Sequence, residues 1–144
     1  MGQSVTDTST ISADVDTIFG IITDLEAYPD WVDGMLETQV VTRDDDGRPR
    51  RAEFRIDARI AEISYTLEYS YDVPNLSWTL VEGEMVNQLD GSYELTDLGD
   101  GRTRVRYSLE ADVDMPVPGF LKKRAAKTIL DQGLRGLKQR AEGS

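Results

Sequence analysis

Residues 35–113 alternate apolar and polar side chains with a period of two over most of their length. The pattern is clearest in RAEFRIDARI, residues 51–60, where each apolar residue is followed or preceded by a charged one. The apolar members are Ala52, Phe54, Ile56, Ala58 and Ile60. Such alternation is typical of antiparallel strands with one buried face and one face in water. The parity reverses before Ile63, which predicts a tight turn between Ile60 and Ile63.

The same period extends along the chain and predicts a sheet of about six antiparallel strands. These strands are expected at residues 36–40, 51–60, 63–71, 76–80, 85–95 and 103–113. A Ser/Thr-rich run containing Val5 and Ile11 suits an additional first strand. A sheet of this kind has one apolar face, which another element must cover.

Helical spacing appears on both sides of the strands. Ser12 or Asp14 can cap a first helix, which must end at Tyr28 because Pro29 follows. Its apolar positions are Val15, Ile18, Phe19, Ile22 and Leu25. Pro29 suits the first turn of a short helix containing Trp31 and Val32. The last helix follows Pro118 and has a predicted buried stripe of Phe120 or Leu121, Ala125 or Ala126, Ile129, Leu130, Gly133, Leu134 and Leu137. We therefore predict an α+β fold in which this long helix covers the sheet.

Two absences exclude much catalytic chemistry. The 144 residues, enough for one domain, include neither cysteine nor histidine. Ser-His-Asp and Cys-His relays and the common Cys- or His-ligated metal sites are thereby excluded, and we expect no metal and no cofactor. The chain also lacks the patterns of a signal peptide or a spanning helix, and we expect a cytoplasmic protein.

The formal charge of −11 is unevenly distributed. Residues 118–144 carry seven basic and two acidic residues, or +5, which leaves −16 for residues 1–117. An acidic body argues against nucleic-acid binding. All four lysines, Lys122, Lys123, Lys127 and Lys138, lie in the basic C-terminal segment. They can make transient contact with an anionic membrane or pair with the acidic body, and the pattern indicates no oligomeric state.

Three segments resemble the START-like (SRPBCC) superfamily, in particular its bacterial polyketide cyclase/dehydrase and lipid-transport proteins. They are ADVDTIFGIITDLEAYPDWVDGM at 13–35, LDGSYEL at 89–95 and VPGFLKKRAAKTILDQGLRGLK at 117–138. The resemblance covers nearly the whole chain. It implies one START-like ligand-binding domain, residues 1–144, with the helix-grip fold. In that fold a curved antiparallel sheet wraps around the C-terminal helix and leaves an elongated apolar cavity between them.

Aromatic residues on the predicted inner face are the candidate ligand-binding residues. The full set is Trp31, Phe54, Tyr65, Tyr69, Trp78, Asn87, Tyr93, Tyr107 and Phe120. Tyrosine and tryptophan carry polar atoms that need partners when buried, so a purely structural core would more simply use Leu, Ile and Val. Trp31 is either a gate at the cavity mouth or a plug in the core. Asn87 binds a ligand or satisfies a bulged backbone group. Gly133 and Gly136 permit close helix–sheet contact or leave space for a ligand.

These residues predict a protein that binds or carries a hydrophobic small molecule or lipid. Nothing in the pattern reads as a paired, buried acid and base, and we name no catalytic residue. A polyketide cyclase or dehydratase acting in the same cavity is the first alternative. A protein–protein interaction module that uses the sheet face or the basic helix is the second.

Overall fold

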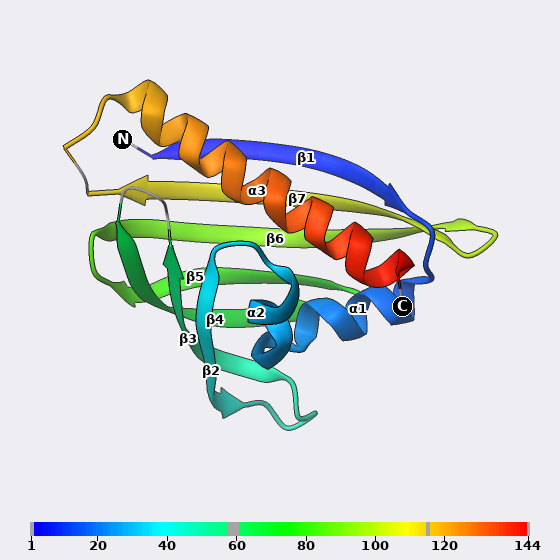
Figure 1. Ribbon diagram of the computed structural model, residues 1–144. Helices are drawn as coiled ribbons and strands as arrows, with labels where there is room; N and C mark the ends of the chain where they lie inside the picture. The colour runs from blue at the N-terminus through cyan, green and yellow to red at the C-terminus, as the bar shows by residue number, and fades with distance from the viewer. Residues whose placement is uncertain (1, 58–60, 115, 144) are drawn as a thin grey trace.

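The computed structural model describes residues 2–57, 61–114 and 116–143 (Figure 1). Their elements, in chain order, are β1 (Gln3–Ile11), α1 (Val15–Thr23), the 3₁₀ turn η1 (Leu25–Ala27), α2 (Tyr28–Trp31), β2 (Met35–Arg43), β3 (Pro49–Asp57), β4 (Glu62–Asp72), β5 (Asn75–Gly83), β6 (Val86–Gly99), β7 (Arg102–Val113) and α3 (Gly119–Glu142). None of the helices in these ranges is sufficiently long and apolar to cross a bilayer.

The strands form one antiparallel sheet in the order β1-β7-β6-β5-β4-β3-β2. The six strands predicted from the alternation are confirmed, as is the additional first strand, which pairs with β7 at the edge. On β3, Ala52, Phe54 and Ile56 are buried while Glu53 is exposed, as the alternation requires. The predicted turn between Ile60 and Ile63 adjoins residues 58–60, which include Ala58 and Ile60 and lie outside the described part of the chain.

The contact between β5 and β6 is shorter than the other ladders. Its pairs are Leu76 with Tyr93, Ser77 with Ser92, and Trp78 with Gly91. Regular pairing of the described residues ends at Trp78, and the Leu80 amide donates to the Asp90 side chain, 3.0 Å away. We call this short ladder the β5–β6 seam.

Local chemistry determines where the first helices begin and end. Asp14 caps α1 by accepting a hydrogen bond from the Thr17 amide at 2.8 Å, which satisfies a free N-terminal donor. The short second helix is confirmed: α2 begins at Tyr28, with Pro29 in its first turn. The first helix ends earlier than predicted, at Thr23, because a 3₁₀ turn intervenes.

Helix α3 crosses the inner face of the sheet and confirms the α+β prediction (Figure 1). Leu130, Leu134 and Leu137 are buried, and burial of each stabilises the fold by roughly 1.5–3 kcal/mol. The first turn does not follow the prediction, because Phe120 is 65% exposed and Leu121 is 37% exposed. The helix therefore packs closely along its C-terminal half and presents its first apolar residues to solvent.

Two glycines allow the close approach of α3. A Cβ atom at Gly133 would lie 3.0 Å from the Tyr107 ring, and one at Gly136 would lie 2.5 Å from the Trp31 carbonyl oxygen. Close helix–sheet contact is confirmed for Gly133, whereas Gly136 meets α2 in place of the sheet. Each glycine lowers the stability of the helix by about 1 kcal/mol relative to alanine, but it allows α3 to contact the sheet and α2 closely.

Two glycine-to-alanine substitutions separate helix propensity from this close contact. Gly20, in α1, has open space around its Cβ position, so Gly20→Ala should raise the free energy of unfolding by about 1 kcal/mol. Gly136→Ala should instead lower it by about 1–3 kcal/mol, because the new methyl group meets the Trp31 backbone. Urea unfolding of both variants measures the difference. A stabilising Gly136→Ala would contradict the packing described.

Candidate functional site

Two small voids lie between α3 and the sheet. The inner one, about 70 Å³, is lined on the helix side by Ile129 and on the sheet side by aromatic residues. The outer one, about 40 Å³, lies under the first half of α3, beside Val117, Lys122 and Ala126. Side chains that line both voids separate them: Ile56, Tyr65, Leu89 and Ile129. Since roughly 10–15 Å³ holds one water molecule, the inner void has room for several.

An almost continuous series of aromatic rings forms the wall of the inner void. The residues are Phe54, Tyr65, Tyr69, Trp78, Tyr93 and Tyr107, all predicted from the sequence. Phe54 stacks on Tyr65 with ring centroids 5.3 Å apart, and Tyr93 stacks on Tyr107 at 4.6 Å. Trp78 joins the two groups through Tyr69, at 5.8 Å, and Tyr93, at 5.5 Å. Such pairs contribute about 0.5–1.5 kcal/mol each beyond the area they bury.

A glycine on β6 makes room for the central ring of this wall. Gly91 lies opposite Trp78 in the β5–β6 seam, and a Cβ atom there would overlap the indole Cζ2 atom. Any larger residue would displace the indole. The segment LDGSYEL, noted for its family resemblance, thus contains a residue that shapes the wall of the void.

Four tyrosine hydroxyls on this wall have no protein partner within the described residues. They belong to Tyr65, Tyr69, Tyr93 and Tyr107, each between 5% and 8% exposed. Burial raises the pKa of all four well above the ordinary value of 10, so they stay neutral. Their oxygen atoms are not fully buried, since the Trp31 Nε1 atom is the one fully buried side-chain polar atom without a partner in the described part of the chain. The hydroxyls therefore border space that a water molecule or a ligand can reach. These groups are therefore available to a bound molecule.

Two other tyrosines show the ordinary arrangement. Tyr28 donates its hydroxyl hydrogen bond to the Ile22 carbonyl, and Tyr71 donates to the Pro49 carbonyl. Burial raises the pKa of Tyr71 to about 12, although its ring also packs against Phe19 and beneath the Arg48 guanidinium. Both hydroxyls connect neighbouring elements and have a structural role. The contrast marks the four unpartnered hydroxyls as the polar part of the candidate site.

Trp31 lies beside the voids but does not line either of them. Its ring contacts Tyr28 edge-on with centroids 5.0 Å apart, and its backbone packs against Gly136 of α3. The indole Nε1 atom is buried and has no hydrogen-bond partner in the described part of the chain. This placement connects α2 to α3 next to the site, which favours the plug over the gate.

Two predicted site residues lie elsewhere. Asn87 is exposed on the outer face, because the pairing of β6 with β7 shifts between Val86 and Gln88 and reverses the parity of the strand. Phe120 points into solvent at the start of α3. The predictions that placed these two side chains on the inner face are wrong.

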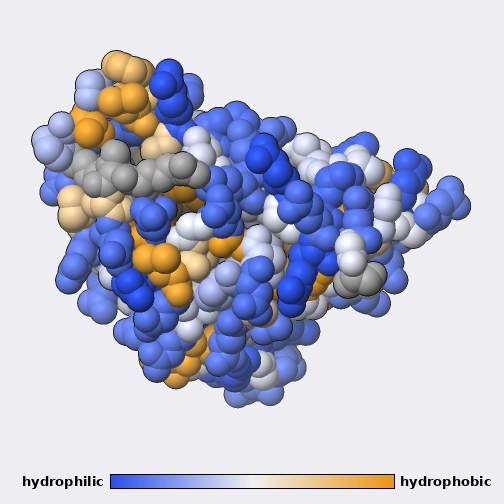
Figure 2. Space-filling model, in the orientation of Figure 1, coloured by the Kyte–Doolittle hydropathy of each residue, from blue (hydrophilic) through white to orange (hydrophobic). Residues whose placement is uncertain are grey.

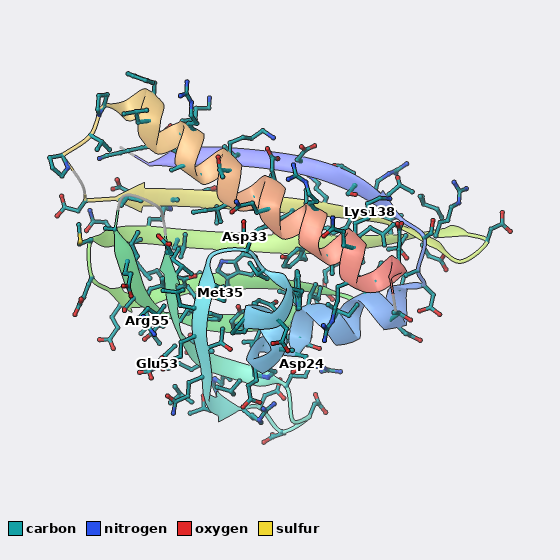
Figure 3. The ribbon with its side chains drawn as sticks, in the orientation of Figure 1. Asp24, Asp33, Met35, Glu53, Arg55 and Lys138 are labelled. Carbon is teal, nitrogen blue, oxygen red and sulfur yellow. The ribbon has the colours of Figure 1, made fainter. Side chains whose placement is uncertain are left out.

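Seven residues that line the inner void were not among the candidates: Tyr28, Met35, Ile56, Leu67, Leu89, Leu109 and Ile129. Ile56, Leu67, Leu89 and Leu109 belong to the apolar faces of the predicted strands. A register shift follows Met35 on β2. This shift places Met35 on the inner face and Leu36 on the outer face. Met35 is the first residue of β2 and lies close to the loop that contains Asp33 (Figure 3). The Gln132 side chain of α3 donates a hydrogen bond to the Asp33 carboxylate at 3.1 Å and so connects this loop to α3. A signal was present for Ile129, which belongs to the predicted buried stripe of α3.

A larger depression, about 460 Å³, lies on the outer face of the sheet and has a different character. It is open and polar, with Glu37, Glu53, Glu82 and Glu84 around Arg55. Arg55 pairs with Glu37 at 3.2 Å and with Glu62 at 2.6 Å. Exposed pairs of this kind stabilise by about 0–1 kcal/mol and belong to ordinary solvated surface. We assign no site there.

The four lysines divide into two groups. Lys127 pairs with Asp7 at 3.3 Å and with Asp131 at 2.7 Å, and Lys138 pairs with Glu142 at 3.0 Å. Lys122 and Lys123 have no ion pair with any described residue. Pairing with acidic residues, one of the two alternatives, therefore holds for half of them.

A curved antiparallel sheet that holds one long helix over an aromatic-lined space defines the START-like class of proteins with the helix-grip fold. The chain belongs to the family described as polyketide cyclase/dehydrase and lipid transport, whose model matches residues 2–142. This confirms the resemblance stated from the sequence. No curated protein matches the chain.

Several solved structures share the fold. A START superfamily protein from Mycobacterium smegmatis is 24% identical, with a TM-score of 0.89 and 96% of each chain covered. The Zhui aromatase/cyclase from Streptomyces sp. R1128 is 13% identical, with a TM-score of 0.82, covering 98% of this chain and 94% of that one. TTHA0849 from Thermus thermophilus is 19% identical, with a TM-score of 0.81 and 96% of each chain covered. At these identities the similarity establishes the fold.

Tyrosine ionisation tests the burial of the aromatic wall. Tyrosines in the unfolded chain ionise near pH 10, while those of the wall remain protonated in the folded state. The unfolded state therefore loses protons first as the pH rises, and the free energy of unfolding should fall above pH 10. Denaturant melts on either side of pH 10, with ultraviolet absorbance to count ionised tyrosines, measure the effect. Reversible ionisation of all tyrosines near pH 10 without loss of stability would contradict the burial.

Truncation of Trp31 separates the plug from the gate. Trp31→Ala should lower the free energy of unfolding by about 3 kcal/mol, near the low end for a large aromatic side chain, because Trp31 is half-buried. The release rate of 1-naphthol from the protein should stay unchanged. Denaturant melts and stopped-flow fluorescence measure the two quantities. Faster release with only a modest loss of stability would indicate a gate.

Proposed function

We propose that the protein binds a largely apolar small molecule or lipid between the sheet and α3, with oxygen groups and no charge in the part that lies in the inner void. The observation that carries this proposal is the set of four unpartnered tyrosine hydroxyls beside the inner void. Rings supply apolar contact, and each hydroxyl can donate to or accept from a carbonyl, hydroxyl or ether oxygen. A pure hydrocarbon would leave these hydroxyls without partners.

The charge of the ligand follows from the residues that surround the inner void. No charged side chain is among the described residues that line it. A charge buried there would lose its hydration without gaining a counter-ion, which is strongly unfavourable. The deep part of the ligand is therefore neutral, and any charged group it carries lies toward Lys122 and Gln3 at the outer void.

Ligand size requires movement of α3 or its neighbours. Pockets for small molecules have volumes of roughly 300–1,000 Å³, several times the space between α3 and the sheet. Ile129 stands between the two voids and is only partly buried, so its displacement joins them. The outer half of α3, where the small side chains Ala125 and Ala126 face the sheet, is the part with room to move.

A polyketide cyclase or dehydratase acting in this space is the second candidate. The structural similarity to an aromatase/cyclase favours it. The four neutral tyrosines can hold and polarise ketone oxygens of a reactive chain, and so promote one ring closure over others. Their raised pKa values suit them to donate hydrogen bonds and make them poor sources of a phenolate base.

Paired probes test the proposed function. 1-Naphthol and naphthalene differ by one hydroxyl group, so the wild-type protein should bind 1-naphthol more tightly. Tyr107→Phe should reduce that preference by about threefold to tenfold, the value of one hydrogen bond, while naphthalene binding stays the same. Fluorescence titration measures both affinities. Failure of both probes to bind would contradict the proposal.

The position of the bound probe is tested with a matched pair of bulky substitutions. Ile129→Trp fills the space between the two voids and should abolish binding, whereas Ile129→Ala should strengthen it. Val81→Trp adds similar bulk at an exposed position on β5 and should have no effect. Circular dichroism confirms that each variant is folded. Equal loss of binding in the Ile129→Trp and Val81→Trp variants would place the probe elsewhere.

A further inference from the structure

The start of α3 exposes apolar side chains at the end of the molecule. Phe120 is 65% exposed and Leu121 is 37% exposed, on successive positions of the first turn. Figure 2 shows apolar side chains gathered over this turn, at the upper left of the view. Leaving a phenylalanine mostly in water forfeits much of the roughly 1.5–3 kcal/mol that its burial provides. The turn thus has apolar surface available to a partner.

Three cations follow these residues directly: Lys122, Lys123 and Arg124. None of the three forms an ion pair with a described residue, whereas Lys127 and Lys138 further along the helix do. Residues 119–130 contain no acidic residue. We call Phe120, Leu121, Lys122, Lys123 and Arg124 the α3 tip. On a chain whose residues 1–117 carry −16, it is a concentrated positive surface with an apolar centre.

The outer void lies directly under this tip. Val117 and Lys122 form part of its lining, and apart from Gln3 and the side chain of Lys122 the rest is apolar or aromatic. Lys122 belongs both to the tip and to the lining of the outer void, so the void reaches the base of the tip.

We propose that the α3 tip docks onto membranes that contain anionic lipids, with Phe120 and Leu121 inserted at the headgroup level. Exposed Phe and Leu flanked by Lys and Arg are the combination that binds at a membrane interface. An acidic protein would complement the three cations but would leave Phe120 and Leu121 without an apolar environment. A bilayer also has an apolar interior that can take up the two apolar side chains. It is in addition a source of apolar ligands, and this role rests on the proposed function.

Nearby acidic residues limit the strength of this docking. Asp112 and Asp114 at the end of β7 and Glu84 before β6 lie on strands and turns next to the outer void or its lining residues. They face the same end of the sheet and repel an anionic surface. The tip therefore has to touch the membrane by its helix side, and the contact is reversible and sensitive to salt.

Vesicle binding tests the proposal with variants of the whole chain. The vesicles contain equal parts of phosphatidylcholine and phosphatidylglycerol, and sedimentation measures the bound fraction. Replacing Lys122, Lys123 and Arg124 with Gln should weaken binding on the order of 100-fold, from about a fivefold loss per cation. Phe120→Gln with Leu121→Gln should weaken it at every salt concentration. Both sets of residues lie at the surface, so the variants should fold normally.

The matched control removes the same charge from another face. Arg102, Arg104 and Arg106 are exposed on the outer face of β7, and replacing all three with Gln should leave vesicle binding unchanged. An equal loss in this control would show non-specific attraction and overturn the proposal. Absence of vesicle binding by the wild-type chain would also overturn it and leave an acidic protein as the partner. Binding of 1-naphthol without vesicles tests the cavity separately, so the two proposals can fail independently.

Discussion

The packing of α3 against the inner face of the sheet is the contact on which the rest of the structure depends. Its C-terminal half is held by buried leucines and by two glycines that bring the helix backbone close to Tyr107 and Trp31. Its N-terminal half rests on alanines above a void and ends in exposed side chains. The helix is therefore anchored at one end and loosely packed at the other. The two small voids lie under α3 because one element alone covers a wide sheet.

The aromatic wall has a structural and a functional component in the same side chains. Ring contacts among Tyr69, Trp78 and Tyr93 hold the inner face together, as leucine and valine would in an ordinary core. Their hydroxyls add polarity without charge, because burial keeps them protonated. Under the proposed function, these hydroxyls would add hydrogen bonds to the apolar contacts that the rings supply to an oxygen-bearing molecule.

Alternation along the strands predicted the sheet and the six aromatic residues that line the inner void, and helical spacing after Pro118 predicted the covering helix. The alternation failed where the backbone departs from regular pairing. Shifts next to Met35 and Val86 reverse which side chains face inward, and so misplaced Asn87 and concealed Met35. The local sequence does not predict either shift, because the position of a bulge also depends on how the partner strand pairs. Phe120 was misplaced for another reason. Helical periodicity predicts which face of a helix is apolar, but it does not predict how much of the length of the helix the sheet covers.

The β5–β6 seam affects how the whole sheet responds to force. A ladder paired along its full length resists a change of curvature, because bending it strains many hydrogen bonds together. With three residue pairs, the seam is the joint in the sheet at which the fewest paired residues oppose a change of curvature. Trp78 and Gly91 lie in the last of these pairs, so the joint runs along the aromatic wall itself. The curvature of the sheet and the packing of the aromatic wall therefore meet at Trp78 and Gly91.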